Sequence, residues 1–251
     1  MLDNKFEQRA PSAQTAVDIF KGRWASNVGE IIPGVSAGPH PLFKQDVRPK
    51  QAAAELGRDG RLEGLRVLEL GPLEGAHSYQ LHSLGAKVTA VEANAEAYLK
   101  CLILKEIANL DGVRFLFGDC VEFLESTKER WDIVFCSGIL YHMNDPVKLI
   151  KLCAEAADKC FIWTHYFDKD LVKAQRTPHR VERFGFSTTY YESTYADRAK
   201  GTFWGGNDAA ACWMTREDII AAFEHFGMKS TVIKDDKSQA VGPCITFAAS
   251  K

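Results

Sequence analysis

The stretch from Arg66 to Ala76, which reads RVLELGPLEGA, combines residue types that suit a nucleotide-type cofactor. Its apolar residues predict a buried β-strand over 67–70, followed by a turn at Gly71 and Gly75. A second apolar run, 88–91, ends on Glu92, about 20 residues after the first glycine. Glycine backbone can approach a ligand closely, and a carboxylate can accept hydrogen bonds from both ribose hydroxyls. The pattern therefore predicts the first half of a cofactor site.

Composition predicts one globular unit with a good-sized core. The chain has 251 residues, of which 46% are hydrophobic and 25% charged. A net charge of -2 and an isoelectric point near 6.4 disfavour nucleic acid as a partner, although a local basic face remains possible. A small-molecule partner is expected instead.

The cysteines predict a reducing compartment. They form no CxxC pair and several lie in apolar runs, so we expect small buried side chains without disulfides or a zinc site. No apolar run approaches the roughly 20 residues of a membrane span, and the polar N-terminus is no secretory signal. We therefore expect no membrane association and a cytoplasmic location.

Strands and helices are expected to alternate from residue 66 onward, which predicts a parallel sheet covered on both faces. The expected strands are 67–71, 87–92, 113–117, 132–136 and 159–164, and the helices are 77–84, 95–109, 120–127 and 146–157. Residues 1–64, with helices over 1–20 and 48–56 and a Gly/Pro-rich passage between, are expected to form an N-terminal cap. Residues 65–251 would form the main domain.

The alternation breaks at Asp168, where an aromatic, polar and glycine-rich segment begins. It is expected to form a lid-like insertion over about 168–211, although its aromatic residues suit core packing equally well. Thr215 to Asp218 is a capping box that predicts the start of a helix ending at Gly227. Two closing strands are expected over 229–234 and 243–248.

Five alternating strands, a helix and two final strands form a pattern that resembles the class I S-adenosylmethionine (SAM) dependent methyltransferases, from Leu65 to Ala249. The resemblance implies an α/β fold: a Rossmann-like, seven-stranded, mostly parallel sheet with helices on both faces and the last strand antiparallel. It also implies SAM as the cofactor and S-adenosylhomocysteine as its product.

By this resemblance, Glu69 would orient the methionine amino group, and Gly71, Pro72 and Gly75 would let the backbone approach the cofactor. The middle glycine of the family's Gly-x-Gly-x-Gly is Leu73 here, which departs from the motif. A dehydrogenase fits less well, because its pyrophosphate fingerprint needs the Gly-x-Gly that this sequence lacks.

The resemblance assigns further cofactor contacts to the ends of the second and third strands. Glu92, with Ala93 and Asn94 after it, matches the ribose-binding acid. Asp119 and Cys120 would reach the adenine amino group and a ring nitrogen. Asp119 equally suits the N-cap of the following helix, and the two roles are compatible.

The fourth expected strand ends in Ser137, and the next five residues read GILYH. In the family this segment lies beside the sulfonium, so Ser137 and Gly138 join the cofactor set. The run from Gly138 to His142 closely resembles the branch that modifies the wobble uridine of tRNA by carboxymethyl transfer from carboxy-SAM. By that resemblance, Tyr141 would sit near the methyl or carboxymethyl end of the cofactor.

His142 is the leading candidate for a general base, because an imidazole titrates near neutral pH. It suits equally a residue at a helix entry, bonded to Asp145 or to backbone. Pro146 fits the first turn of a helix, with Asp145 as its N-cap. His165 and Asp168 follow the fifth strand at the same sheet edge and suit a second base or metal ligands. Two such residues do not make a metal site, so no metal is expected.

Three functions are compatible with these residues. The first is SAM-dependent methyl transfer to oxygen, less readily nitrogen, of a small acceptor, with His142, Tyr141 and His165 at the reaction centre. The second is modification of tRNA with SAM or carboxy-SAM, and the third is a non-catalytic SAM-binding fold, which the departure at Leu73 favours. The acceptor is expected to contact aromatic side chains, namely Trp24, Tyr190, Tyr191 and Trp204.

Overall fold

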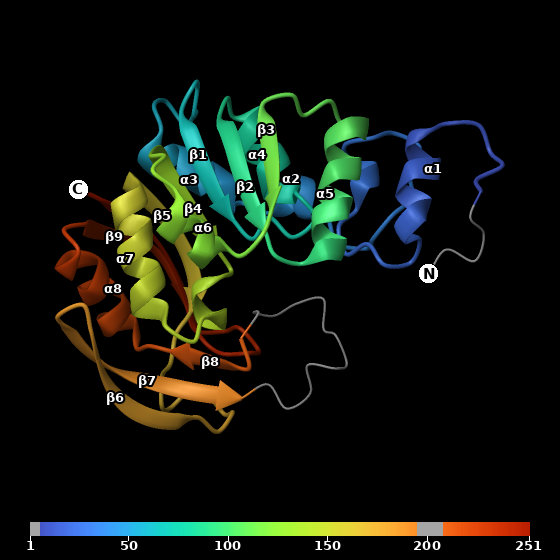
Figure 1. The fold of residues 1–251 in the computed structure, drawn as a ribbon. Helices are drawn as coiled ribbons and strands as arrows, with labels where there is room; N and C mark the ends of the chain where they lie inside the picture. Colours follow the sequence, from blue (N-terminus) through green and yellow to red (C-terminus); the bar gives the residue numbers. More distant parts are fainter. Residues whose placement is uncertain (1–5, 195–207) are drawn as a thin grey trace.

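The computed structural model describes residues 6–194 and 208–251. Its main sheet has seven strands in the order β3-β2-β1-β4-β5-β10-β9 (Figure 1). The first five are parallel, and β10 runs antiparallel to both β5 and β9. The predicted fold class is confirmed. The strands are β1 (Arg66–Leu70), β2 (Lys87–Glu92), β3 (Val113–Phe117), β4 (Trp131–Ser137), β5 (Ala157–His165), β9 (Lys229–Asp236) and β10 (Cys244–Ser250).

Helices cover both faces of this sheet (Figure 1). Because the central strands are buried on both faces, they are almost continuously apolar. In β1, Val67 packs into the core on one face, and Leu68 and Leu70 pack into the core on the other. The helices are α1 (Ala13–Val17), α2 (Leu42–Gln45), α3 (Arg48–Leu56), α4 (Ala76–Ser83), α5 (Ala95–Ile107), α6 (Cys120–Ser126), α7 (Pro146–Ala156) and α8 (Arg216–His225).

Side-chain caps fix where four of the helices that follow β1 begin. In each, an oxygen of the capping side chain accepts a hydrogen bond from a backbone amide of the first turn, at 2.8 to 3.2 Å. Three of the capped helices follow a parallel strand after a short loop, so the caps stand at the carboxyl edge of the sheet. The caps are Asn94 of α5, Asp119 of α6, Asp145 of α7 and Thr215 of α8.

The insertion contains a second sheet that the sequence did not predict. Its antiparallel strands are β6 (Thr177–Arg183), β7 (Phe186–Thr194) and β8 (Ala210–Trp213). The Cys212 amide donates to the Met143 carbonyl at 2.8 Å, and the Tyr190 hydroxyl donates to Asp145 at 2.6 Å. The small sheet is thus joined to the segment after β4, at the carboxyl edge of the main sheet (Figure 1). Whether it acts as a lid stays a prediction.

The N-terminal segment packs into the same core as one face of the sheet. Of the helix expected over 1–20, residues 1–5 lie outside the described residues. Within 6–20 the helix is shorter than predicted, since α1 covers Ala13–Val17 and a 3-10 turn continues it to Phe20. Val17, Trp24 and Phe43 are buried in the cluster that also contains residues of β1 and β2. The division into a cap over 1–64 and a domain over 65–251 stays a prediction.

A buried ion pair fastens this segment to the loop after β1. Glu74 and Lys100 are both fully buried, and their charged atoms lie 2.8 Å apart. The Glu74 carboxylate also accepts from the amides of Ala25 and Ser26 at 2.7 to 3.0 Å, while Lys100 donates to the Arg23 carbonyl. Residues 23–26 are therefore held against the candidate cofactor loop.

Replacement of Glu74 by alanine should strongly destabilise the fold, because Lys100 would lose a buried partner. Breaking such a pair typically costs about 3–5 kcal/mol. Urea unfolding monitored by circular dichroism measures the change. The matched control is Arg130→Ala, which removes an exposed ion pair with Asp158 and should change the free energy of unfolding little. An equally small change in Glu74→Ala would contradict the anchoring role.

Candidate cofactor and acceptor site

The loop after β1 takes the backbone conformation of a glycine-rich turn, despite its leucine. Gly71, Leu73 and Gly75 have φ angles of +65°, +57° and +82°. At Gly75 a Cβ atom would lie 2.9 Å from the Leu104 side chain, so the loop is closely packed there. A left-handed leucine costs roughly 1–3 kcal/mol, which the surrounding structure must offset. The departure at Leu73 therefore leaves the course of the loop intact.

Glu92 joins the loops that follow β1 and β2. One carboxylate oxygen accepts from the Leu73 amide at 2.9 Å, and the other accepts from the Asn94 amide at 2.8 Å. Burial raises the pKa of Glu92, although hydrogen bonds from the amides of Asn94, Leu73 and Ala93 oppose the shift. A carboxylate has about four lone-pair sites and these amides use at most three, so Glu92 retains acceptor capacity for a ligand.

Glu69 is a buried acid with one unsatisfied oxygen. Its Oε2 accepts from the Ser78 hydroxyl, whereas its Oε1 has no hydrogen-bond partner among the described residues. The Nδ1 atom of His77 lies 3.9 Å from Oε1, too far for a hydrogen bond. Burial raises the pKa of Glu69 to about 8, and the charge of Glu92 adds to the shift. A buried acceptor of this kind calls for a donor, and an ammonium group would suit it.

The N-terminal segment supplies polar residues that sequence reasoning missed. Asp46 accepts from His77 Nε2 at 2.9 Å and forms an ion pair with Arg48. Arg48 also donates to the Ser137 hydroxyl at 2.9 Å and lies 4.7 Å from the centre of the Trp163 ring. Burial opposes ionisation of Asp46, but the hydrogen bonds from Arg48 and His77 bring its pKa well below the usual range.

Asp119 is confirmed as the N-cap of α6. Its Oδ1 accepts from the amides of Val121 and Glu122 at 2.8 and 3.1 Å. Burial raises the pKa of the neighbouring Cys120 thiol to about 12, so this side chain is a neutral thiol at neutral pH. The adenine contacts of Asp119 and Cys120 stay predictions.

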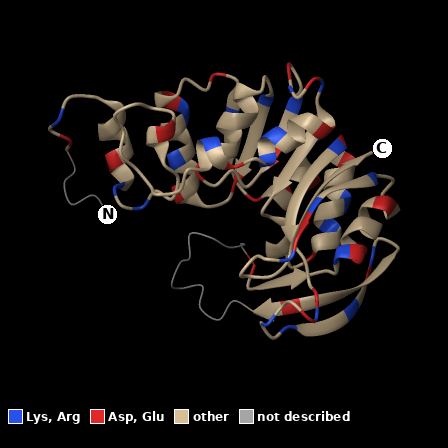
Figure 2. Ribbon diagram, turned by 180° about the vertical axis from the view of Figure 1, so that it is seen from behind, with Lys and Arg blue, Asp and Glu red and all other residues tan. Residues whose placement is uncertain are grey.

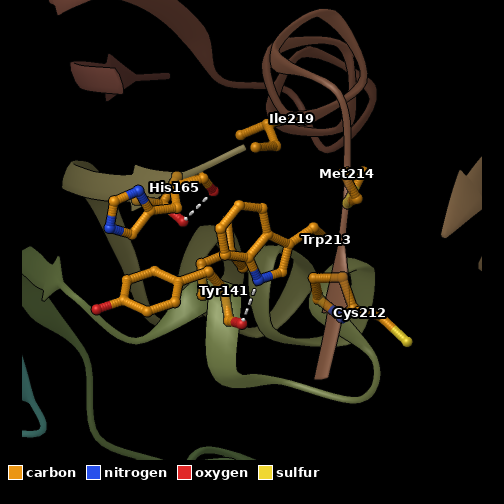
Figure 3. A pocket seen from close by; sticks show the side chains of 9 residues that line it. Tyr141, His165, Cys212, Trp213, Met214 and Ile219 are labelled. Atoms are coloured by element: carbon orange, nitrogen blue, oxygen red, sulfur yellow. Dashed lines mark hydrogen bonds between the residues drawn. The ribbon is translucent and has the colours of Figure 1, made fainter. Parts of the chain in front are cut away.

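An aromatic cluster follows β4 and β5. The Tyr141 ring centre lies 4.8 Å from that of His165, 6.0 Å from Trp163 and 6.1 Å from Trp213. Trp213 stacks on His165 with ring centres 5.5 Å apart, and its indole donates to the Tyr141 carbonyl at 3.0 Å (Figure 3). Tyr141, His165 and Trp213 line a small pocket at this edge, together with Leu140, Pro146, Thr164, Cys212, Met214 and Ile219.

Both histidines of this cluster are neutral at neutral pH. The Nδ1 of His165 lies 2.9 Å from the Gly242 carbonyl and 3.2 Å from that of Pro243. Because carbonyls only accept, Nδ1 carries the proton, and Nε2 keeps its lone pair. Burial lowers the pKa of His165 and brings that of His142 to about 4, with the charge of His165 adding to the second shift. Either ring can accept a proton.

Of the residues expected to contact the acceptor, the three that the structure describes do not line the aromatic pocket. Trp24 is buried in the core, and its indole donates to the Val17 carbonyl at 2.9 Å. Tyr190 is also buried, and its hydroxyl is bonded to Asp145, so both residues serve packing in this structure. Tyr191 stacks on Phe167 with ring centres 3.6 Å apart. Trp204 lies outside the described residues.

The remaining predicted residues cluster at the carboxyl edge. Gly138, with φ of +88°, follows β4, and its amide donates to the Trp163 carbonyl at 2.9 Å. Pro72 is buried within the glycine loop. The cofactor set and the catalytic candidates thus lie at the ends of adjacent strands, where open parallel sheets bind ligands.

Comparisons with known proteins agree with this architecture. A family model described as "Methyltransferase domain" matches residues 62–185. The tRNA U34 carboxymethyltransferase of Campylobacter hominis is 29% identical over 43% of this chain and 39% of its own length. The ubiquinone biosynthesis O-methyltransferase of Bordetella pertussis is 31% identical over 39% of this chain and 40% of its own. The chain thus spans about two fifths of the length of these curated relatives.

Among solved structures, the N-terminal domain of EvdMO1 with S-adenosylhomocysteine bound has a TM-score of 0.66 at 21% identity. The match covers 87% of this chain and 88% of that one. Magnesium protoporphyrin IX methyltransferase from Synechocystis PCC 6803 has a TM-score of 0.55 at 18% identity, covering 98% and 100%. At such identities the likeness shows the fold alone.

The fold and the edge site define a Rossmann-like protein of the methyltransferase class. The family model and the sheet topology place the chain among the class I SAM-dependent methyltransferases, as its sequence predicted. SAM, the cofactor expected from the sequence, is the methyl donor of this family. No helix among residues 6–194 and 208–251 is long and apolar enough to cross a membrane.

The environment of His142 predicts an unusual titration. Its ring should keep a pKa of about 4, because burial disfavours the charged form, and should therefore stay neutral from pH 5 to 8. Proton NMR of the imidazole C2–H follows this titration, with His142→Asn identifying the resonance. A midpoint near the ordinary 6.5 would show that the ring is solvated.

Proposed function

We propose that this chain transfers a methyl group from SAM to an oxygen, less readily a nitrogen, of a small-molecule acceptor. The observation that carries the proposal is the unpaired Oε1 of Glu69, buried beside a loop in the conformation of a glycine-rich turn. A hydrogen-bond donor is needed there, and the methionine end of SAM has an ammonium group. When bound, SAM supplies a methyl group already activated by the positive sulfur.

The remaining cofactor contacts follow from the edge geometry. Glu92 keeps lone pairs for the ribose hydroxyls, beside the Leu73 amide that it already holds. Asp119 is the proposed adenine contact, and its Oδ1 also caps α6 by accepting from the amides of Val121 and Glu122. Ser137 and Gly138 border the sulfur end, where Arg48 donates to the Ser137 hydroxyl. Arg48 is therefore an additional candidate for the methionine carboxylate.

The aromatic cluster supplies the acceptor side. His142, whose ring centre lies 4.2 Å from that of Tyr141, is the proposed base, and His165 is the second candidate. The acceptor hydroxyl would give its proton to the imidazole while its oxygen bonds to the methyl carbon. The carbon–sulfur bond breaks in the same step, and S-adenosylhomocysteine leaves. Positioning accounts for most of the catalysis, because the methyl is already activated.

A second candidate function is carboxymethyl transfer to tRNA. It is supported by the Campylobacter relatives named tRNA U34 carboxymethyltransferase and by the Gly138–His142 segment. Arg48 beside Ser137 could recognise the extra carboxylate of carboxy-SAM. Weighing against tRNA, the net charge is -2, and Figure 2 shows acidic and basic residues interspersed over the ribbon. A cytoplasmic location stays a prediction under either function.

A non-catalytic SAM-binding role has less support than the sequence suggested. Its only basis was Leu73, and this residue takes the left-handed conformation that a glycine would supply. The amide of Leu73 still points at Glu92, so the loop keeps its polar contacts.

The affinity for S-adenosylhomocysteine should rise with pH between 6 and about 7.5. Glu69 has a pKa of about 8 and must lose its proton to bind an ammonium, while a free α-amino group stays charged below about 8. The dissociation constant should therefore fall up to about tenfold per pH unit. Isothermal titration calorimetry measures the slope. In the isosteric Glu69→Gln variant the slope should vanish, and an unchanged slope would remove Glu69 from the site.

The identity of the bound cofactor distinguishes the candidate functions. We expect S-adenosylhomocysteine to bind, carboxy-SAM to bind no better, and NAD not to bind, by calorimetry on the full chain. Glu92→Gln should weaken binding roughly 10- to 100-fold, since a hydrogen bond to a charged group contributes about 1.5–3 kcal/mol. A clear preference for carboxy-SAM would favour the tRNA function. Failure of all three ligands would remove the enzyme proposal.

A further inference from the structure

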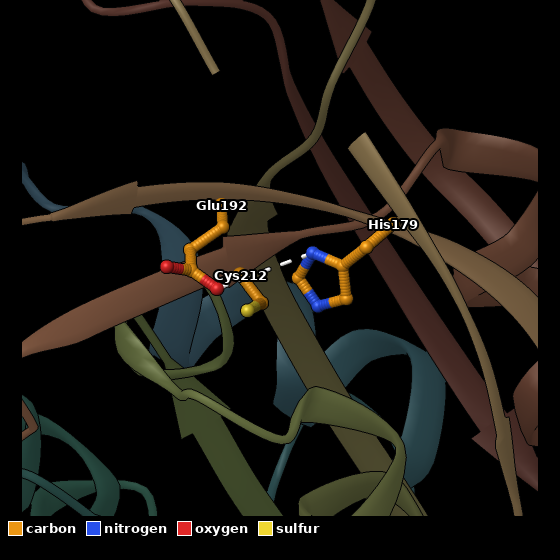
Figure 4. Close-up of side chains that lie close together, drawn as sticks. All are labelled: His179, Glu192 and Cys212. Carbon is orange, nitrogen blue, oxygen red and sulfur yellow. Dashed lines mark ion pairs between the residues drawn. The ribbon is translucent and has the colours of Figure 1, made fainter. Parts of the chain in front are cut away.

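Three potential metal ligands converge on one face of the small sheet. His179 comes from β6, Glu192 from β7 and Cys212 from β8 (Figure 4). Glu192 pairs with Cys212, and His179 pairs with Tyr190, which lies two residues before Glu192. Because side chains alternate along a strand, this register places all three on the same face. One nitrogen, one oxygen and one sulfur lie within 4.8 Å of one another.

The charge around this cluster would attract a cation. Glu192, Asp145 and Asp208 place negative charge near the Cys212 thiol, and Arg176 places one opposing positive charge there. The cluster is also accessible, since the side chains of His179 and Glu192 are 39% and 38% exposed. An ion can therefore enter from solvent and meet the buried sulfur.

We propose that His179, Glu192 and Cys212 bind one Zn²⁺ ion that cross-links the three strands of the small sheet. Mixed nitrogen, sulfur and carboxylate donors suit zinc, whereas magnesium and calcium take oxygen ligands. Three protein ligands leave the fourth position to water. Donors around tetrahedral zinc lie roughly 3.5 Å apart, so the side chains need to close by about 1 Å.

Cys212 also lines the aromatic pocket, but its sulfur points away from the rings (Figure 3), and the zinc proposal does not depend on the proposed function. Cys212 and Trp213 are adjacent in β8 and point to opposite faces, as Figure 3 shows. Trp213 contacts Tyr141 and His165, whereas the Cys212 sulfur points away from them. The sequence predicts no metal, because its cysteines form no CxxC pair and His165 and Asp168 are only two potential ligands. It does not reveal the pairing of β6, β7 and β8, which brings the three ligands together.

To test the site, the full chain is treated with a chelator, reloaded with Zn²⁺ and separated from excess metal. The zinc bound per chain is then measured. We expect one zinc per chain and a higher melting temperature with zinc than without. His179→Ala removes a partly exposed ligand without disturbing the core, and it should weaken zinc binding about tenfold or more. In His179→Ala, zinc should no longer raise the melting temperature. The matched control is His225→Ala, which should bind zinc normally; the His225 ring lies beside the same sheet, with its centre 5.5 Å from that of Phe186.

Cobalt(II) substitution tests the sulfur ligand directly. The unaltered chain and His225→Ala should show a thiolate-to-cobalt charge-transfer band, and Cys212→Ser should lack it. Absence of zinc or of this band from the reloaded chain would overturn the site, as would equal zinc content in His179→Ala. S-adenosylhomocysteine affinity should be the same in His179→Ala and the unaltered chain, so failure of the zinc site leaves the methyltransferase proposal standing.

Discussion

The hydrogen bond between the Leu73 amide and the Glu92 carboxylate holds the candidate site together. It joins the loops after β1 and β2, two neighbouring parallel strands whose carboxyl ends meet at one edge. Glu69 lies in β1 and Asp119 follows β3, and β2 lies between these two strands. The hydrogen bond fixes the loop after β1 relative to β2, so Glu69, Glu92 and Asp119 lie along one edge of the sheet. The left-handed backbone at Leu73 directs its amide to Glu92, which helps to offset the strain of a leucine in that conformation.

The N-terminal segment completes this edge and is held to it by charge. Glu74 lies inside the same loop and binds Lys100 and the amides of residues 25 and 26. Further along the segment, Arg48 contacts Ser137 on the loop after β4. The cofactor loop is thus contacted from the sheet on one side and from the N-terminal segment on the other. A buried charged pair is costly unless both partners remain, so this arrangement couples the order of the segment to the site.

Local signals made most of the main sheet predictable from the sequence. The strands 87–92 and 113–117 and the helix 48–56 were predicted with their observed bounds, because apolar periodicity and capping residues act over a few positions. The contact of Arg48 with Ser137 spans 89 residues, so no local pattern could reveal it. The strands β6 and β7 are largely polar and β6 is mostly exposed, so they lack the apolar pattern by which the strands of the main sheet were predicted. Trp24 was assigned to the acceptor on its residue type, but aromatic type alone does not distinguish a pocket wall from core packing.

Binding of a positive charge in the site would account for the burial of an acid at position 69. A carboxyl whose pKa is about 8 in the folded chain and 4.5 when exposed makes folding take up a proton between those values. The free energy of unfolding contributed by this group therefore falls as the pH rises from 4.5 to 8, and the loss persists above that range. An apolar residue at this position would avoid the loss. An acid at this position lowers the free energy of unfolding at neutral pH. A bound ligand with an ammonium group would raise it again, because the ligand stabilises the ionised carboxylate. Glu69 and Glu74 differ in this respect. Glu74 already pairs with the cation Lys100, whereas Glu69 has an unpaired oxygen at the sheet edge.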